Sequence, residues 1–248
     1  MADFAIAGFA LWQVGIALAA TLASAFVRGL AGFGMAILLV PVIALALDPV
    51  QAVMTANLLG LLVGLTEWRW IMGYAERSAR TISAMVALTT LPGLVVLALT
   101  PAPLARLLIA IVALSAFAAM LMPPRKAAVH GRPATLAVGA ASGLLTGFAG
   151  MPGPPVVPYY VGRPIPREVA KASMILIFTV AGGIGLMSGA VLGELDLRLL
   201  ALALSLFPVV VIGNWLGRKA SGHVGDKAWR IFAAAVLGAA ALAAILKL

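Results

Sequence analysis

Cysteine is absent from the 248-residue chain, and charged residues make up only 10% of it. The lack of cysteine excludes disulfide bonds and thiolate metal sites. A soluble domain of this length would carry roughly 25% charged residues. This chain is instead 63% hydrophobic, with a mean hydropathy of +1.13. The sequence therefore predicts an all-α polytopic integral membrane protein.

Acidic residues are also few, and all eight Asp and Glu side chains lie in loops or at the ends of apolar segments. A proton or sodium relay built on acids in mid-segment is therefore not expected. A coupling proton or sodium ion would have to use backbone carbonyls, hydroxyls or a carboxylate near an interface, such as Glu67. The two histidines, His130 and His223, lie in loops without metal-ligand spacing, so no metal site is predicted.

Enzyme motifs are missing as well. The chain has no His-Glu-x-x-His, no Gly-x-Ser-x-Gly and no nucleotide-binding phosphate loop. We therefore predict neither an enzyme activity nor a cofactor.

Long apolar segments fill most of the chain. They recur at about 8–27, 30–46, 50–66, 81–100, 103–122, 134–149, 151–162, 168–193, 199–216 and 228–246. A membrane-spanning helix needs about 20 apolar residues, and the segments at 30–46 and 151–162 are shorter. The pattern predicts about ten transmembrane segments, eight of them full and these two broken or re-entrant.

The two halves of the chain resemble each other. A shift of about 118 residues places Gly29 on Gly147 and Thr55 on Ser173, which indicates an internal repeat. We predict a first repeat at 1–124, a basic cytoplasmic joint at 125–132 and a second repeat at 133–248. Five crossings per half is an odd number, so the repeats are expected to be inverted. In the alternative, re-entrant motif segments leave eight crossings and parallel halves, which the charge pattern disfavours.

The net charge of +9 is explained by membrane topology rather than by nucleic acid, because the basic residues lie in short loops. With the N-terminus outside, only Arg106, Arg198 and Lys247 of the 17 basic residues stay outside, which leaves 14 inside. This distribution obeys the positive-inside rule and predicts a multi-pass protein of a bacterial-type inner membrane.

Two glycine-rich stretches occupy corresponding places in the two halves. Residues 28–41 read RGLAGFGMAILLVP, and residues 147–158 read GFAGMPGPPVVP. Glycine and proline weaken a helix, and a broken helix inside a membrane must be buried in protein or line a cavity. Paired breaks of this kind indicate the substrate site of a secondary transporter.

A helix that begins after such a break presents free N–H groups and the positive end of its dipole to an anion. We predict substrate contacts from the two motifs, namely Gly32, Phe33, Gly34, Gly150, Met151 and Gly153. Because the prolines of the second motif have no N–H, Met151 and Gly153 are the expected donors there. The alternative is that the glycines only allow close helix packing.

Polar and basic side chains next to the motifs complete the predicted site. Asn57, Thr55 and Ser173 are expected to add hydrogen bonds, and Arg28 or Lys171 to add positive potential. In the alternative, Thr55 and Ser173 bond their own helix backbone, and the two basic residues are interfacial anchors.

At these motifs the chain resembles the sulfite exporter TauE/SafE family of membrane transporters. The resemblance covers essentially the whole chain and lies in a glycine-rich motif ending in Val-Pro in each half, here at Pro41 and Pro158. The usual Gly-Gly-Gly core is altered, because Met35 and Ala36 follow Gly34 and prolines interrupt the second motif. The family implies movement of sulfur-containing oxyanions, such as sulfite, sulfoacetate or other organosulfonates, in either direction.

We therefore predict a secondary transporter of a small sulfur-containing oxyanion that works by alternating access. The alternatives are an anion channel of the same architecture and a non-transporting membrane subunit. The expected partners are a small organic or inorganic anion and the lipid bilayer, without nucleic acid. A coupling proton or sodium ion and a homodimer are left open.

Overall fold

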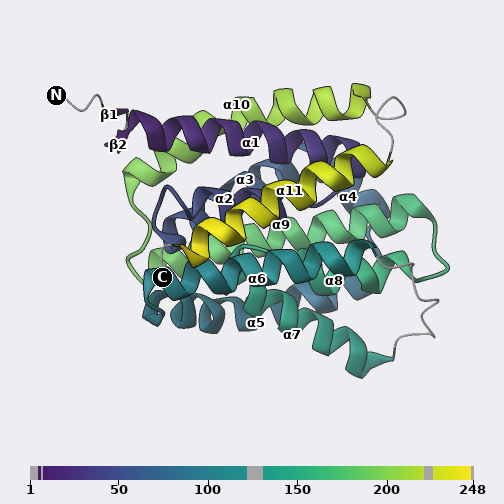
Figure 1. Ribbon diagram of the computed structural model, residues 1–248. Helices are drawn as coiled ribbons and strands as arrows, with labels where there is room; N and C mark the ends of the chain where they lie inside the picture. The colour runs from purple at the N-terminus through teal and green to yellow at the C-terminus, as the bar shows by residue number, and fades with distance from the viewer. Residues whose placement is uncertain (1–4, 7, 122–130, 221–225, 247–248) are drawn as a thin grey trace.

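The computed structural model describes residues 5–6, 8–121, 131–220 and 226–246. These residues form eleven helices and one pair of two-residue antiparallel strands, β1 (Ala5–Ile6) and β2 (Phe9–Ala10) (Figure 1). The predicted all-α class is confirmed. Most of the predicted basic joint, residues 125–130, lies outside the described residues.

The helices fall into two runs separated by that joint. The first run comprises α1 (Leu11–Ala31), α2 (Met35–Ile43), α3 (Pro49–Thr66), α4 (Trp68–Tyr74), α5 (Arg77–Leu99) and α6 (Ala102–Leu121). The second comprises α7 (Arg132–Ala149), α8 (Gly153–Val161), α9 (Arg167–Val191), α10 (Leu197–Ala220) and α11 (Asp226–Ile245). Both runs contain one long helix followed by a helix of nine residues, α2 or α8.

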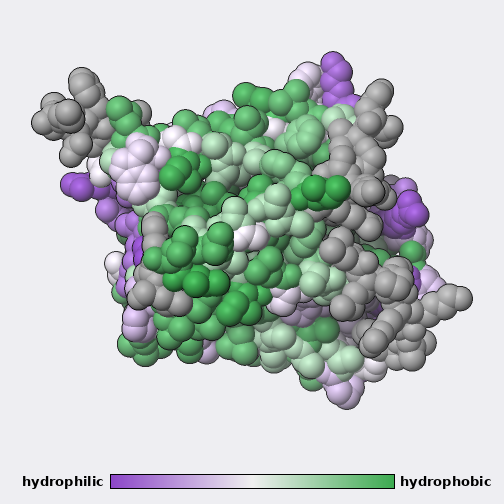
Figure 2. Space-filling view, viewed as in Figure 1, coloured by the Kyte–Doolittle hydropathy of each residue, from purple (hydrophilic) through white to green (hydrophobic). Residues whose placement is uncertain are grey.

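Six of the described helices are long and apolar enough to cross a membrane: α1, α3, α5, α6, α9 and α10. Figure 2 shows hydrophobic surface across the middle of the molecule and hydrophilic residues toward its two ends. Large apolar side chains lie exposed on this surface, among them Leu88 and Val191 at 69% and 77%. Apolar surface this extensive indicates contact with lipid. The protein is a multi-pass membrane protein.

Glycines set the closest helix contacts. Helix α1 packs along α10, and α5 packs along α7 (Figure 1). A β-carbon on Gly29 would lie 2.5 Å from the carbonyl oxygen of Asn214, and one on Gly147 would overlap the carbonyl of Thr90. The first glycine of each motif therefore allows close helix packing, as the alternative explanation of the glycines predicted.

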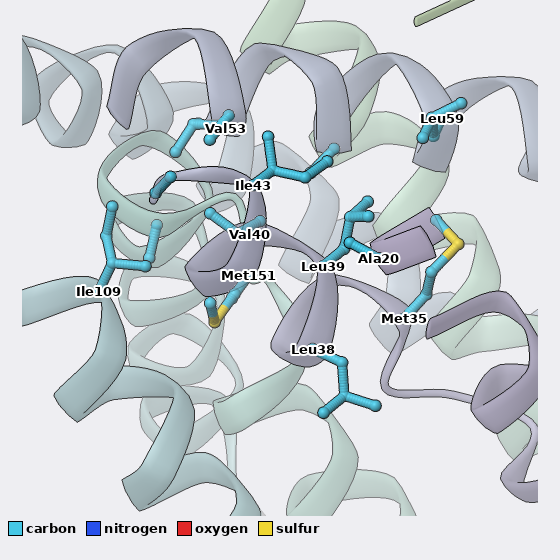
Figure 3. Close-up of a cluster of buried hydrophobic side chains, with 14 of the residues drawn as sticks. Ala20, Met35, Leu38, Leu39, Val40, Ile43, Val53, Leu59, Ile109 and Met151 are labelled. Carbon is cyan, nitrogen blue, oxygen red and sulfur yellow. The ribbon is translucent and has the colours of Figure 1, made fainter. Parts of the chain in front are cut away.

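Helix α2 is enclosed by the rest of the protein. Its residues Leu39, Val40 and Ile43 are fully buried, and Figure 3 shows them packed among side chains from several other helices. Their neighbours in the same core include Ile109 of α6 and Met151 of the second motif. This burial meets the requirement that a broken helix at membrane depth be covered by protein.

Candidate functional site

Each glycine motif forms a break between a long helix and a short one. Helix α1 ends at Gly32, which has φ +85°, and α2 begins after Gly34, which has φ +94°. Helix α7 ends in the same way at Gly150, with φ +64°. Left-handed backbone at these positions favours glycine, because a β-carbon would clash with the chain. The predicted breaks are therefore present in both halves.

Helices α2 and α8 are too short to cross a bilayer alone. Nine residues rise only about 13 Å, against roughly 30 Å of hydrocarbon. Their N-terminal turns line one shared cavity of about 80 Å³. The cavity is several times larger than the 10–15 Å³ that one water molecule needs, so it can hold a small solute.

The structure brings eight of the eleven predicted site residues to this cavity. They are Arg28, Gly32, Phe33, Gly34, Asn57, Gly150, Met151 and Gly153. The remaining wall is largely apolar and comes from α2, α3, α8 and α9. Among its residues are Ile37, Val63, Val157, Ile175 and Phe178.

Backbone N–H groups reach the cavity mainly from α2. The first N–H groups of a helix have no partner within it, and Met35, Ala36 and Ile37 of this first turn all line the cavity. In the second half, the amide of Met151 already donates to the carbonyl of Leu145 at 3.1 Å. Met151 is therefore not the free donor that the sequence predicted, and Gly153 is left in that role.

Asn57 is a buried polar residue in the wall of the cavity. It lies on α3, is only 3% exposed and lines the cavity. Its Nδ2 atom has no hydrogen-bond partner within the described part of the chain. Gly182 and Gly185 of α9 pack directly against this residue, so α9 holds the amide in place. A buried donor without a partner costs roughly 1–3 kcal/mol and therefore calls for an explanation, such as a ligand.

One ion pair stands at the edge of the cavity. Arg28, in the last turn of α1, places Nη2 3.5 Å from Oε1 of Glu67, which lies between α3 and α4. The two side chains are 11% and 24% exposed. Among the described residues, Arg28 is the one charged side chain that lines the cavity. The cavity therefore contains a single positive charge, which Glu67 neutralises.

Three predicted site residues lie away from the cavity. The hydroxyl of Thr55 donates to the carbonyl of Gln51 at 2.8 Å, so the alternative explanation applies to it. The hydroxyl of Ser173 instead accepts the backbone N–H of Glu76 at 3.0 Å, which fixes the start of α5 against α9. The exposed ammonium of Lys171 lies 5.5 Å from the centre of the Trp70 ring, in a cation–π contact.

Part of the cavity wall that the sequence analysis missed follows the same internal shift. Ile175, Phe178 and Gly182 of α9 lie 118 positions after Asn57, Gly60 and Gly64 of α3, and all six line the cavity. Applying the shift along α3 would have found the wall on α9. Apolar residues and glycines in a hydrophobic helix give no other signal of a site.

A cavity between two half-length helices, inside a bundle of membrane-spanning helices, is typical of a membrane transporter. The family model described as sulfite exporter TauE/SafE matches residues 16–244. The chain belongs to the sulfite exporter TauE/SafE family, whose members are transporters and not enzymes.

A curated relative supports this assignment. The chain is 28% identical over 206 residues to a protein of Cupriavidus necator named probable sulfite/organosulfonate exporter TauE. The match covers 79% of this chain and 80% of the relative. No solved structure matches the chain.

Proposed function

We propose that this protein is a secondary transporter that carries a small sulfur-containing oxyanion across a bacterial-type inner membrane by alternating access. The class of substrate, an organosulfonate, sulfite or sulfoacetate, is supported by the family and by the name of the relative from Cupriavidus necator. The observation that supports the binding site is the shared cavity. The first turns of α2 and α8 line it together with Asn57, whose Nδ2 has no partner among the described residues.

The cavity offers an oxyanion three kinds of favourable contact. The N–H groups at the start of α2 and the positive end of its dipole attract negative charge. The amide of Asn57 supplies a further donor, and Arg28 supplies the one cationic side chain of the cavity wall, paired with Glu67. The apolar wall excludes water, which strengthens each of these electrostatic contacts. The oxygens of the anion would bind at this polar side, with the rest of the substrate against the apolar wall.

The internal shift supports alternating access between two related halves. Seven pairs of cavity residues are related by 118 positions: Gly32 with Gly150, Phe33 with Met151, Gly34 with Pro152, Met35 with Gly153, Asn57 with Ile175, Gly60 with Phe178 and Gly64 with Gly182. The packing of α1 on α10 corresponds to that of α7 on α5. A cavity at the junction of inverted repeats opens to either side when one half rocks against the other.

The membrane orientation follows from the basic residues. Arg28 lies in the last turn of α1, and Arg218 and Lys219 lie in the last turn of α10. These two helices pack along each other, and the positive-inside rule then places their ends in the cytoplasm. The N-terminus of α1 would lie outside.

Reconstitution of the purified protein into liposomes tests this function. We expect labelled sulfite, taurine, sulfoacetate or methanesulfonate to exchange across the membrane, with saturation and with counterflow against a gradient. Flux that never saturates and never runs uphill would identify an anion channel instead. No flux of any of these anions through the purified protein would leave a non-transporting subunit as the better assignment.

A thermal-shift screen with the same anions selects the substrate before transport is measured. A ligand that binds only the folded protein raises its melting temperature by mass action. The matched negative probes are the uncharged amide or alcohol of the same size, which the cavity cation and the helix dipole do not attract.

A further inference from the structure

The one cationic side chain at the cavity, Arg28, is already paired with a carboxylate from this chain. The carboxylate of Glu67 sits on the Arg28 guanidinium at 3.5 Å, whereas Glu67 itself does not line the cavity. Glu67 caps the end of α3 and the start of α4, so its side chain approaches Arg28 from outside the binding space. An anion that enters the cavity therefore meets a cation that already has a partner.

Charge balance shows what this pair does when an anion arrives. The empty site is neutral, because the single charge of Arg28 is cancelled by Glu67. A monovalent anion bound beside the intact pair would leave one uncompensated negative charge in a largely apolar cavity. Uncompensated buried charge is strongly disfavoured. A proton taken up by Glu67 removes its charge, frees Arg28 for the anion and keeps the site neutral.

We propose that Glu67 is the proton-coupling residue of this transporter. Its carboxylate forms the ion pair with Arg28 while the cavity is empty. When the carboxylate takes up a proton, this ion pair is lost and Arg28 can bind the substrate anion. One proton then accompanies one negative charge. This inference rests on the proposed function and adds to it the identity of the coupling ion and the group that binds it.

The charges around Glu67 agree with a single coupling group. Among the described residues, only Arg28 forms an ion pair with it. The other charged side chains toward this end of the helices around it are Arg69, Glu76, Arg77, Arg80, Arg132, Arg163, Arg167, Glu168, Lys171, Arg218 and Lys219, and of these Arg218 is close enough to Arg28 to repel it. The positions 118 residues after Arg28 and Glu67 are occupied by Thr146 and Gly185, so the second half has no equivalent pair.

A binding experiment with two variants tests the proposal. The probe is methanesulfonate, because its single charge does not change between about pH 5.5 and pH 7.5. We expect calorimetry on the wild-type protein to show binding about tenfold tighter at the lower pH, within the usual range of coupling between two ligands. Glu67→Gln should bind tightly at both pH values. Glu76→Gln is the matched control and should follow the wild type, since Glu76 pairs with Arg163, away from the cavity.

A proton-flux measurement gives a second readout in liposomes loaded with a pH-sensitive dye. Uptake of methanesulfonate through the wild-type protein should acidify the interior. Glu67→Gln should still exchange methanesulfonate but no longer acidify the interior, and Glu67→Asp should restore acidification.

Two results would overturn the coupling role alone. One is methanesulfonate binding in Glu67→Gln with the same pH dependence as the wild type. The other is wild-type uptake of methanesulfonate without proton movement, which decides the matter even if the Gln variant fails to fold. A wild-type protein that neither binds nor moves any tested sulfonate at either pH would instead refute the proposed function, and the coupling role with it.

Discussion

Replacing Asn57 by leucine separates a ligand-binding role from a structural one. Both side chains branch at the same carbon, so leucine preserves the shape that packs against Gly185. The change removes the Nδ2 donor that has no partner in the described protein. Stability and binding should therefore change in opposite directions.

The size of each effect follows from the burial of Asn57, which is 3% exposed. An unmet buried donor costs roughly 1–3 kcal/mol, so removing it should leave the empty protein as stable or up to about 1 kcal/mol more stable. In a chain of this length, 1 kcal/mol raises the melting temperature by about 2–4 °C. A hydrogen bond to a charged group is worth about 1.5–3 kcal/mol, so anion binding should weaken roughly 10- to 150-fold.

The assay combines thermal melting in detergent with calorimetric titration of the best anion from the screen. Thr21→Val is the matched control, because the Thr21 hydroxyl is also buried with no partner among the described residues but does not line the cavity. This control should melt at the same or a higher temperature and keep its affinity. A lower melting temperature for Asn57→Leu together with unchanged affinity would show that Asn57 is structural and would refute the reasoning.

Three further substitutions test the surroundings of the cavity. Gly34→Ala places a methyl group in open space, but the left-handed backbone there makes alanine cost roughly 1–2 kcal/mol of conformational strain. We expect this variant to transport more slowly in liposomes. Gly15→Ala, which also meets open space but has no left-handed backbone, is the control and should transport normally. Gly147→Ala drives a β-carbon into the backbone of α5 and should lower the melting temperature by several degrees, with a cost of about 1–3 kcal/mol. Ser173→Ala removes the acceptor of the Glu76 N–H and should cost about 1 kcal/mol with anion affinity intact. Weaker anion binding in that variant would show that Ser173 takes part in substrate binding after all.

Much of the fold and of the cavity could be predicted from the sequence, because the signals involved are local. Hydropathy indicates membrane helices wherever the apolar runs occur. Gly32, Gly34 and Gly150 mark helix breaks because each adopts a left-handed backbone that other residues avoid. The repetition of this pattern after about 118 residues indicated which breaks belong together. Ten segments in inverted repeats stay a prediction, since six described helices meet the length and hydropathy needed to span a membrane.

The orientation of individual side chains could not be predicted in this way. Thr55 and Asn57 are two positions apart on α3, which turns them about 200° from each other around the helix axis. Only one of them can face the cavity, and the sequence contains no sign of which. Ser173, the counterpart of Thr55, faces away for the same reason. The amide of Met151 is engaged by Leu145, a contact that depends on how the helix end folds back on itself.

The sequence by itself determined the class of protein, the positions of the two broken helices and the family, because composition, glycine placement and repetition are readable along a single chain. Only the tertiary structure decided that the two breaks share one cavity, that Asn57 lines it with an amide that has no partner among the described residues, and that Glu67 pairs with Arg28. Each of these depends on the packing of helices that are distant in sequence. Packing is a sum of many weak contacts, so it cannot be predicted from any single residue in the sequence.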